Sequence, residues 1–365
     1  MDTGANQDGE PARYVAFGGF TNVWTLRAGL SRLGIDLTVV RDDGPAMVPR
    51  DRYTPASGDV LFFSEEQSLR HFLDQTDYTF WPRGLSVAVD DKYIFSEALV
   101  SLGERPVPFR PLDLAGAPPA TPCVIKARRS WHGGDRFIRG YVCHTPQELE
   151  SRLEDVRARA WGADEFFVQD YLPDGVRNCF SVAGFFDSTR PERSVLIVTR
   201  KLLSIASGFR GSGIAVEVVP DPAGLLERTR RLLSAIDYTG PFELEFLHDD
   251  QGNYFILEMN PRFWMQHGIF VDCLDNIVLR RYLGDDRASE PPPTSGVTWI
   301  SSVDLMAMPV KLGPATFAKT LALLARRRWA GERVLLTPPI SVALRFLASL
   351  AWRRLRDLLR TGGSG

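Results

Sequence analysis

The sequence lacks long hydrophobic runs and a surplus of charge of one sign. Its 365 residues contain no run of about 18 uninterrupted apolar residues, so no transmembrane helix is expected. Residues 1–12 contain no apolar signal region and are predicted to form a disordered tail. The net charge is only −2, which argues against a general nucleic-acid binder. These features indicate a soluble globular protein.

Paired cysteines and clustered histidines are also missing. The four cysteines lie far apart in the chain and form no Cys-x-x-Cys pair, which favours a reduced, cytoplasmic protein. The five histidines show no metal-ligand spacing, so no zinc site is proposed, and the lone His267 is interpreted as structural.

The most informative stretch is a predicted β-hairpin between Gly240 and Arg262. Two apolar alternating runs, Phe242–Leu247 and Tyr254–Met259, flank a polar turn that contains Gly252. Side chains alternate between the two faces of a strand. Glu243 and Glu245 are therefore expected on one face, opposite to Phe242, Leu244 and Phe246. Glu258 and Asn260 are likewise expected together, opposite to Phe255, Leu257 and Met259.

Carboxylates gathered on a rigid hairpin repel one another unless a cation lies between them. Oxygen ligands of this kind suit Mg²⁺, which takes one or two carboxylates together with phosphate oxygens and water. A solvent-facing pair of acidic strands is the alternative interpretation. The apolar character of both strands and the Asn260-Pro261-Arg262 sequence that follows favour the metal site.

The spacing of Glu245, Glu258, Asn260 and Arg262 resembles the metal-binding signature of the ATP-grasp superfamily, carboxylate–amine ligase type. The resemblance implies that Glu245, Glu258 and Asn260 hold Mg²⁺, with Mn²⁺ as an alternative, on the phosphates of ATP. It also implies that Arg262 faces the reacting acyl or phosphoryl group.

Other family positions follow in the same order along the chain. Asp90-Asp91-Lys92 precedes a predicted helix, where Asp90 could cap the helix while Lys92 reaches a phosphate. Lys126 lies in the apolar strand Cys123–Ala127, and a basic loop with Gly133 and Gly134 comes after it. In full, the resemblance makes Arg262 and Lys126 catalytic and implies a nucleotide-binding set of Lys92, Lys126, His132, Gly133, Gly134, Gln169, Asp170, Tyr171, Leu172 and Lys201.

The adenine-binding part of this set lies at the end of the predicted strand Glu165–Leu172. The resemblance places Gln169 as the side-chain contact, with Asp170 and Leu172 as backbone contacts and Tyr171 between them. An ordinary strand before a turn is the alternative. Two further strands, 178–186 and 194–201, are expected to pair, and Arg200-Lys201 ends the second, either over phosphates or in solvent.

The fold class implied is α/β (α+β) with an ATP-grasp architecture. A strand, a glycine turn, a helix and a second strand open the chain, which indicates a parallel layer. The expected divisions are a Rossmann-like domain at 13–88, a central subdomain at 89–164, a grasp subdomain at 165–290, and a C-terminal extension at 291–365.

The C-terminal extension is predicted to hold a strand at Val297–Leu305 and helices at 315–329 and 341–360. The last helix is basic and amphipathic. We favour packing on the core with the arginines outward over contact with a membrane surface or a partner.

The function that the resemblance implies is amide or peptide-bond formation, in which ATP converts a carboxylate to an acyl phosphate that an amine attacks. The expected substrates are a small-molecule carboxylate and amine, with an amino acid or short peptide favoured. A kinase or carboxylase acting on another acceptor and a non-catalytic nucleotide-binding protein are the alternatives. Homo-oligomerisation stays open.

Overall fold

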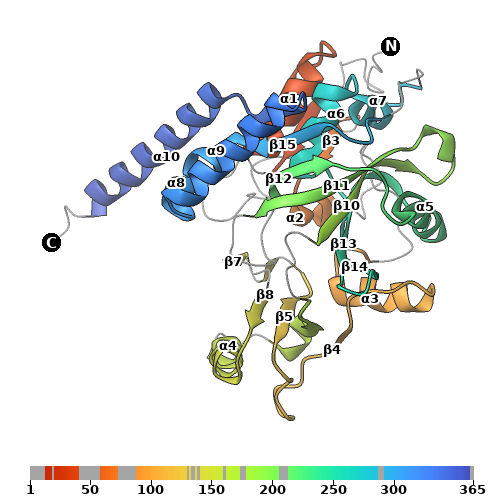
Figure 1. Ribbon diagram of the computed structural model, residues 1–365, viewed down its shortest axis with the longest axis vertical. Helices are drawn as coiled ribbons and strands as arrows, with labels where there is room; N and C mark the ends of the chain where they lie inside the picture. The colour runs from red at the N-terminus through yellow and green to blue at the C-terminus, as the bar shows by residue number, and fades with distance from the viewer. Residues whose placement is uncertain are drawn as a thin grey trace.

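The computed structural model describes residues 13–18, 20–40, 58–72, 88–129, 131–132, 136–137, 140–158, 162–172, 178–204, 213–286 and 292–361. Gly133 and Gly134 lie outside the described residues. The same holds for 207–212 of the glycine-rich stretch before β12 and for the predicted N-terminal tail. The chain folds around a long antiparallel sheet, with a small parallel sheet on one side and a four-stranded sheet at the opposite end (Figure 1).

The N-terminal sheet is parallel, as the sequence predicts. Its order is β2-β1-β3, from the strands Tyr14–Phe17 (β1), Leu37–Val40 (β2) and Val60–Phe63 (β3). The helices are Phe20–Ser31 (α1) and Glu66–Phe72 (α2). Short apolar strands of this kind are covered on both faces, and Val15, Ala16 and Phe62 are fully buried.

The four-stranded sheet has the order β4-β9-β5-β8. Its strands are Phe109–Pro111 (β4), Cys123–Ala127 (β5), Gly140–Cys143 (β8) and Phe166–Asp170 (β9). The helix Pro146–Ala158 (α4) packs on one face, where Ile125 and Val168 join Leu149 and Leu153 in a common core. The helix Lys92–Ser101 (α3) and the short pair Trp131–His132 (β6) and Arg136–Phe137 (β7) complete this region.

The long sheet has seven strands in the order β14-β13-β10-β11-β12-β15-β16. These are Cys179–Asp187 (β10), Val195–Ser204 (β11), Gly213–Val218 (β12), Thr239–His248 (β13), Tyr254–Asn260 (β14), Val297–Ser301 (β15) and Arg333–Thr337 (β16). The pairs are antiparallel except β15 with β16, which is parallel. The helix Leu225–Ala235 (α5) covers one face, and Gly268–Cys273 (α6) with Ile277–Tyr282 (α7) lie toward the N-terminal sheet.

The C-terminal extension differs from the prediction in two ways. The strand expected at Val297–Leu305 ends at Ser301, whose hydroxyl accepts from the Asp304 N–H and caps the helix Ser302–Lys311 (α8). The parallel strand β16 was not predicted. The helices Pro314–Trp329 (α9) and Ile340–Thr361 (α10) were. Among the described helices, none is both long and apolar enough to cross a membrane.

The domain boundaries at 164 and 290 remain a prediction. Two strands, however, belong to other sheets than these boundaries imply. β9 belongs to the sheet of β5 rather than to the long sheet. β15 and β16 extend the long sheet rather than standing apart from it. The reason is the same in both cases, because strand partners that are distant in sequence carry no local signal.

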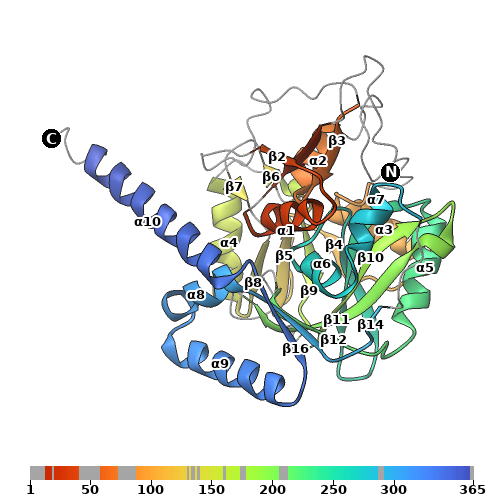
Figure 2. The same cartoon turned by 90° about the horizontal axis from the view of Figure 1, so that it is seen from above.

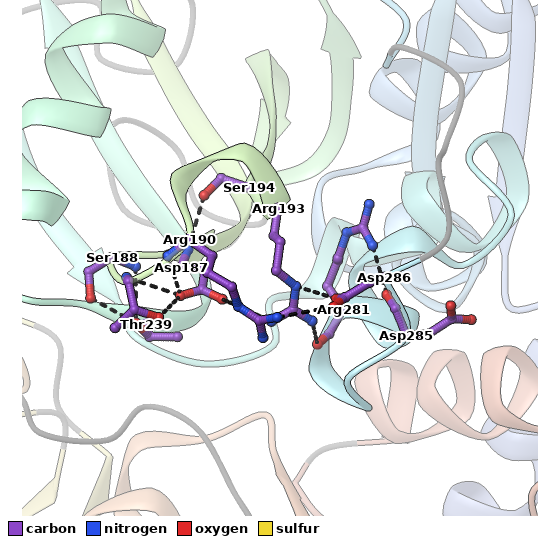
Figure 3. Close-up of polar contacts among 10 residues, drawn as sticks. Asp187, Ser188, Arg190, Arg193, Ser194, Thr239, Arg281, Asp285 and Asp286 are labelled. Carbon is purple, nitrogen blue, oxygen red and sulfur yellow. Dashed lines mark hydrogen bonds and ion pairs between the residues drawn. The ribbon is translucent and has the colours of Figure 1, made fainter. Parts of the chain in front are cut away.

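A charged network fixes the turn between β10 and β11 (Figure 3). Asp187 accepts hydrogen bonds from the Thr189 and Arg190 N–H groups. It also forms an ion pair with Arg193 at 2.9 Å. Arg193 also pairs with Asp286 at 2.5 Å and donates to the Arg281 carbonyl of α7. Burial opposes the charge on Asp187, but these donors hold its pKa below the usual range. The network anchors this end of the sheet to α7.

Candidate active site

The predicted hairpin is present and gathers four polar side chains on one face. The register pairs Glu243 with Asn260 and Glu245 with Glu258, and directly opposed residues share a face. The register shifts after Glu245, where Leu257 is the extra residue of a β-bulge. Both pairs lie before the bulge, in unbroken register, so their four side chains share one face while Phe242, Leu244 and Phe246 fill the other.

The bulge also corrects one prediction. Phe255 was expected opposite to Glu258, but its register partner is Leu247, which lies on the face of Glu245. Phe255 and Leu257 pack with Leu172 and Leu247 in one apolar cluster beside the polar face. The alternation rule fails here because one inserted residue reverses every side chain that precedes it on the strand.

Lys201 neutralises the buried end of this face. Its ammonium lies 2.7 Å from Glu245 Oε2, and both side chains are about nine-tenths buried. Burial opposes the charge on Lys201, while Cys179, Glu245 and Glu243 raise its pKa above the usual range. Its neighbour Arg200 pairs instead with Glu217 and is partly exposed. Arg200 and Lys201 therefore lie in different surroundings, and only Lys201 contacts a predicted ligand. β11 does not end at these residues as predicted but continues to Ser204.

Glu243 lies deeper than the sequence suggested and was not among the predicted ligands. It accepts a hydrogen bond from Asn260 Nδ2 at 3.1 Å. Burial, and then the neighbouring charge of Glu245, raises its pKa to about 7. Its contact with Asn260 orients the amide oxygen of that residue away from Glu243. Glu243 therefore acts as a support for a predicted ligand.

Lys126 joins the four-stranded sheet to the hairpin. The register pairs Lys126 with Phe167 and Val124 with Gln169, so Lys126 and Gln169 share the face that α4 does not cover. Lys126 Nζ lies 3.0 Å from Glu258 Oε2 and donates to the Leu257 carbonyl at 3.3 Å. Burial lowers the pKa of Lys126, although Glu258 opposes that change. The two sheets thus meet at an ion pair between two predicted site residues.

Lys92 is the first residue of α3 and interacts electrostatically with charged groups of the site. Its charge acts on Glu66 and on Lys126. The cap of this helix differs from the prediction, because Asp91 rather than Asp90 accepts from the Tyr93 and Ile94 N–H groups. Asp91 also pairs with Arg128 at 3.0 Å. That pair ties the start of α3 to the end of β5 and so fixes Lys92 beside Lys126.

Arg262 follows the end of β14 and contacts the start of α2, next to the N-terminal sheet. It pairs with Glu66 at 2.6 Å and donates to Asn260 Oδ1 at 3.3 Å. Burial opposes the charge on Arg262, but Glu66 raises its pKa. Glu65 and Glu66, at the junction of β3 and α2, were not predicted as site residues. The double glutamate after an apolar strand was the available signal.

Glu65 is a buried carboxyl group beside this pair. One oxygen accepts from the Ser68 hydroxyl, and the other, Oε2, has no hydrogen-bond partner among the described residues. Burial raises its pKa from the ordinary value of 4.5 to about 7, against the opposing effects of Ser68 and Arg262. The group is therefore close to half-protonated at neutral pH.

This shift predicts a pH-dependent stability. The folded state holds the Glu65 proton more tightly than the unfolded state, so this contribution is complete below pH 4.5 and is lost as the pH rises toward 7. Glu65→Gln stays neutral and should gain stability over the wild type across this window, by up to about 3 kcal/mol. Urea denaturation at pH 5 and pH 8 measures it, with exposed Glu227→Gln as control. An equal difference at both pH values would contradict the assignment.

The predicted adenine-binding segment lies only partly at the site. Gln169 is fully buried, and neither its Oε1 nor its Nε2 atom has a partner among the described residues. Leu172 joins the apolar cluster of Phe255 and Leu257. Tyr171 packs edge-on against His144, and Asp170 pairs with Arg110 at 3.6 Å on the exposed side. The side chain of His132 lies outside the described residues.

An unpartnered buried amide is costly, and this one faces the polar side of the site. A ligand edge that offers one donor and one acceptor, as adenine does, would satisfy both atoms. We expect Gln169→Leu to leave the free protein unchanged or more stable by about 1 kcal/mol, because the buried polar atoms are removed. Binding of ATP should weaken roughly tenfold. Denaturation and calorimetric titration measure the two effects, and a variant that loses stability but keeps ATP affinity would contradict this role.

Two buried reactive groups of the described region, Cys179 and His267, are unsuited to covalent catalysis. Burial raises the pKa of Cys179 to about 12, so its thiol stays protonated. Burial lowers the pKa of His267 to about 4, and its ring packs against Phe263 and Trp264 with a hydrogen bond to the Trp264 carbonyl. His267 thus has the surroundings of a structural residue.

The oxygen ligands on this face of the hairpin suit a metal ion that phosphate oxygens coordinate as well. Within the described ranges, no group of three or more His, Cys, Asp or Glu side chains is arranged to hold a metal ion by itself. Glu245, Glu258 and Asn260 offer two carboxylates and an amide oxygen on one face, and Glu258 is 21% exposed. Mg²⁺ suits such an incomplete set because it keeps waters and takes phosphate oxygens.

The described architecture defines a class of protein. A four-stranded sheet and a long sheet are joined by the Lys126–Glu258 ion pair, and a parallel sheet precedes them in the chain. Comparison with solved structures places it among the ATP-grasp folds, which confirms the fold predicted from the sequence. No family model and no curated sequence matches the chain.

Three solved structures illustrate the likeness. A carboxyaminoimidazole ribonucleotide synthase from Aspergillus clavatus, complexed with ATP, has a TM-score of 0.56 at 14% identity, over 77% of this chain and 79% of that one. An N5-carboxyaminoimidazole synthetase from Staphylococcus aureus, complexed with ADP, gives 0.55 at 14%, over 82% and 85%. The biotin carboxylase domain of a Hydrogenobacter thermophilus 2-oxoglutarate carboxylase, with MgADP and bicarbonate, gives 0.53 at 14%, over 78% and 73%.

Proposed function

We propose that this protein is an ATP- and Mg²⁺-dependent ligase that joins a small carboxylic acid to an amine through an acyl phosphate, with release of ADP and phosphate. The observation that carries the proposal is the Lys126–Glu258 ion pair, which joins the face of Gln169 to the carboxylates of the hairpin. ATP held between the sheets would span from Gln169 to Arg262. The ATP, ADP and MgADP in the similar structures support this choice of ligand.

Each charged residue has a role in this proposal. Lys92 and Lys126 balance the negative charge of the phosphates, while Lys201 pairs with Glu245 and fixes its position. Glu245, Glu258 and Asn260 would hold Mg²⁺, which supplies positive charge between the transferred and leaving oxygens. Arg262, held by Glu66, would bind the oxygens of the acyl phosphate.

The chemistry balances without a covalent enzyme intermediate. A carboxylate oxygen attacks the γ-phosphorus, and the bond from that phosphorus to ADP breaks. The amine then attacks the acyl carbon, phosphate leaves with the electrons of its C–O bond, and the amine gives up a proton. We propose that Glu65, with a pKa of about 7 and next to Arg262 and Glu66, accepts that proton.

Carboxylation is the second candidate, and the similar structures favour it specifically. The Hydrogenobacter thermophilus domain was solved with bicarbonate, and the other two act in carboxyaminoimidazole formation by name. Bicarbonate is itself a small carboxylate that ATP could phosphorylate at the same site. An amino acid or short peptide remains our preferred amine, and the two candidates differ in the acid that is activated.

The test is ADP release from ATP and Mg²⁺ against pooled carboxylic acids and pooled amines, including amino acids and short peptides. One arm is purged of bicarbonate. Release that needs one acid and one amine and persists in the purged arm supports the ligase. Release that requires bicarbonate supports the carboxylase, and a stable phosphorylated product with no amine requirement indicates a kinase. ATP binding without release from any pool would contradict all three enzymatic candidates.

A further inference from the structure

The C-terminal helix α10 leaves the body of the protein. Both views show its C-terminal part extending away from the sheets and from the other helices (Figures 1 and 2). Its buried contacts lie near its start, where Ala343 is fully buried and Phe346 and Leu347 are partly covered. The expected packing of this helix along the core therefore applies only to its first turns.

The helix keeps its apolar side chains beyond the point where the body covers them. Leu344 is 47% exposed and Trp352 is 66% exposed. Apolar residues continue at helical spacing through Leu355 to Leu358 and Leu359 in the sequence. A large, exposed aromatic residue on an amphipathic helix indicates a surface that meets something apolar.

Positive charge accompanies this apolar side. α10 contains five arginines and one acidic residue, Asp357. The segment 302–361 carries eleven Lys and Arg residues against three Asp and Glu residues, although the whole chain has a net charge of −2. A large excess of positive charge therefore lies in the segment of the chain that ends in α10.

The end of α9 repeats the same combination. Trp329 is 94% exposed and follows three consecutive arginines. Arg327 pairs with Glu217 at 2.6 Å and with Glu332 at 3.0 Å, whereas Arg326 and Arg328 point to the exposed surface. Two segments of the extension therefore present a tryptophan next to arginines.

We infer that α10 docks the protein on an anionic lipid bilayer, with the helix lying in the headgroup region rather than across the membrane. Arginines beside leucines and a tryptophan complement acidic headgroups and the acyl boundary beneath them. A second copy of α10 is the less suitable occupant, because five arginines on each helix would bring like charges together. The catalytic site would then work close to a membrane surface.

The experiment is flotation of the full-length protein with vesicles of phosphatidylcholine, alone or mixed with phosphatidylglycerol in roughly equal parts. The expected result is binding to the anionic vesicles only, weakened by salt. Trp352→Glu and Arg353→Glu should each reduce binding roughly tenfold. Val100→Glu on α3 and Arg231→Glu on α5, at positions where the side chain is 57% and 63% exposed, are the matched controls and should bind as the wild type does.

Three results would overturn the inference. One is no binding to anionic vesicles at low salt, and another is equal loss of binding in the control variants. The third is a dimer of the wild-type protein that Trp352→Glu converts to a monomer while vesicle binding is absent, which would assign the helix to a second copy. Circular dichroism of each variant, which should match the wild type, separates lost binding from lost folding.

Discussion

Glu258→Ala is expected to reduce ATP-dependent turnover about a thousandfold, which is the scale of losing one preorganised charge at a transition state. Glu258 is the most exposed of the three proposed ligands and lies where Lys126 reaches across from the other sheet. The loss should appear in kcat more than in the affinity for ATP, because Gln169 and the lysines remain. Steady-state ADP release, with the acid and amine pair that stimulates it, measures the effect.

The fold should survive this change. The Glu258 side chain is 21% exposed, but the change leaves the buried Lys126 ammonium with only the Leu257 carbonyl, so we expect a stability loss of about 1–3 kcal/mol. The matched control is Glu217→Gln, a carboxylate of the same sheet that pairs with Arg200 and Arg327 away from the site. That variant should lose stability and keep turnover. Full turnover by Glu258→Ala would refute the metal assignment.

Lys201→Met is expected to destabilise the protein by about 3–5 kcal/mol, because removing one partner of a buried ion pair leaves the other charge uncompensated. Lys201 lies 2.7 Å from Glu245, and the next carboxylate, Glu243, already has a pKa raised to about 7 by burial and by Glu245. Without the ammonium group, this face would hold two close carboxylates with little solvent. Urea denaturation without nucleotide or metal measures the loss.

A double variant separates charge from shape. Lys201→Met combined with Glu245→Gln removes both charges while it keeps the side-chain volumes, so most of the lost stability should return. The double variant should remain inactive, since Glu245 is a proposed ligand. A Lys201→Met protein within about 1 kcal/mol of the wild type would show that the pair carries no such energy.

The sequence predicted the hairpin and its shared polar face because both depend on local alternation. Glu243, Glu245, Glu258 and Asn260 share a face as expected, and the lysines of two other elements meet them. The face of Phe255 was predicted wrongly, because the bulge at Leu257 leaves no mark in a residue pattern. A count of alternating residues assumes an unbroken register.

Contacts between segments that are distant in the sequence were not predicted either. Nothing near Glu65 and Glu66 indicates that Arg262 will lie 2.6 Å from one of them, because the N-terminal sheet brings them together. The parallel strand β16 was missed for the same reason, since its partner β15 is distant in sequence. The cap of α3 moved by one residue, from Asp90 to Asp91, which is the usual scale of error at a helix end.

The most direct test of the ligase proposal traps the acyl phosphate. Wild-type protein with ATP, Mg²⁺ and hydroxylamine is offered pooled carboxylic acids, and the hydroxamate formed is compared with the ADP released. The proposal predicts equal amounts of both from one acid, and neither from Glu258→Ala. Stimulated ADP release without hydroxamate from any acid would contradict an acyl phosphate and point to phosphoryl transfer to another kind of acceptor.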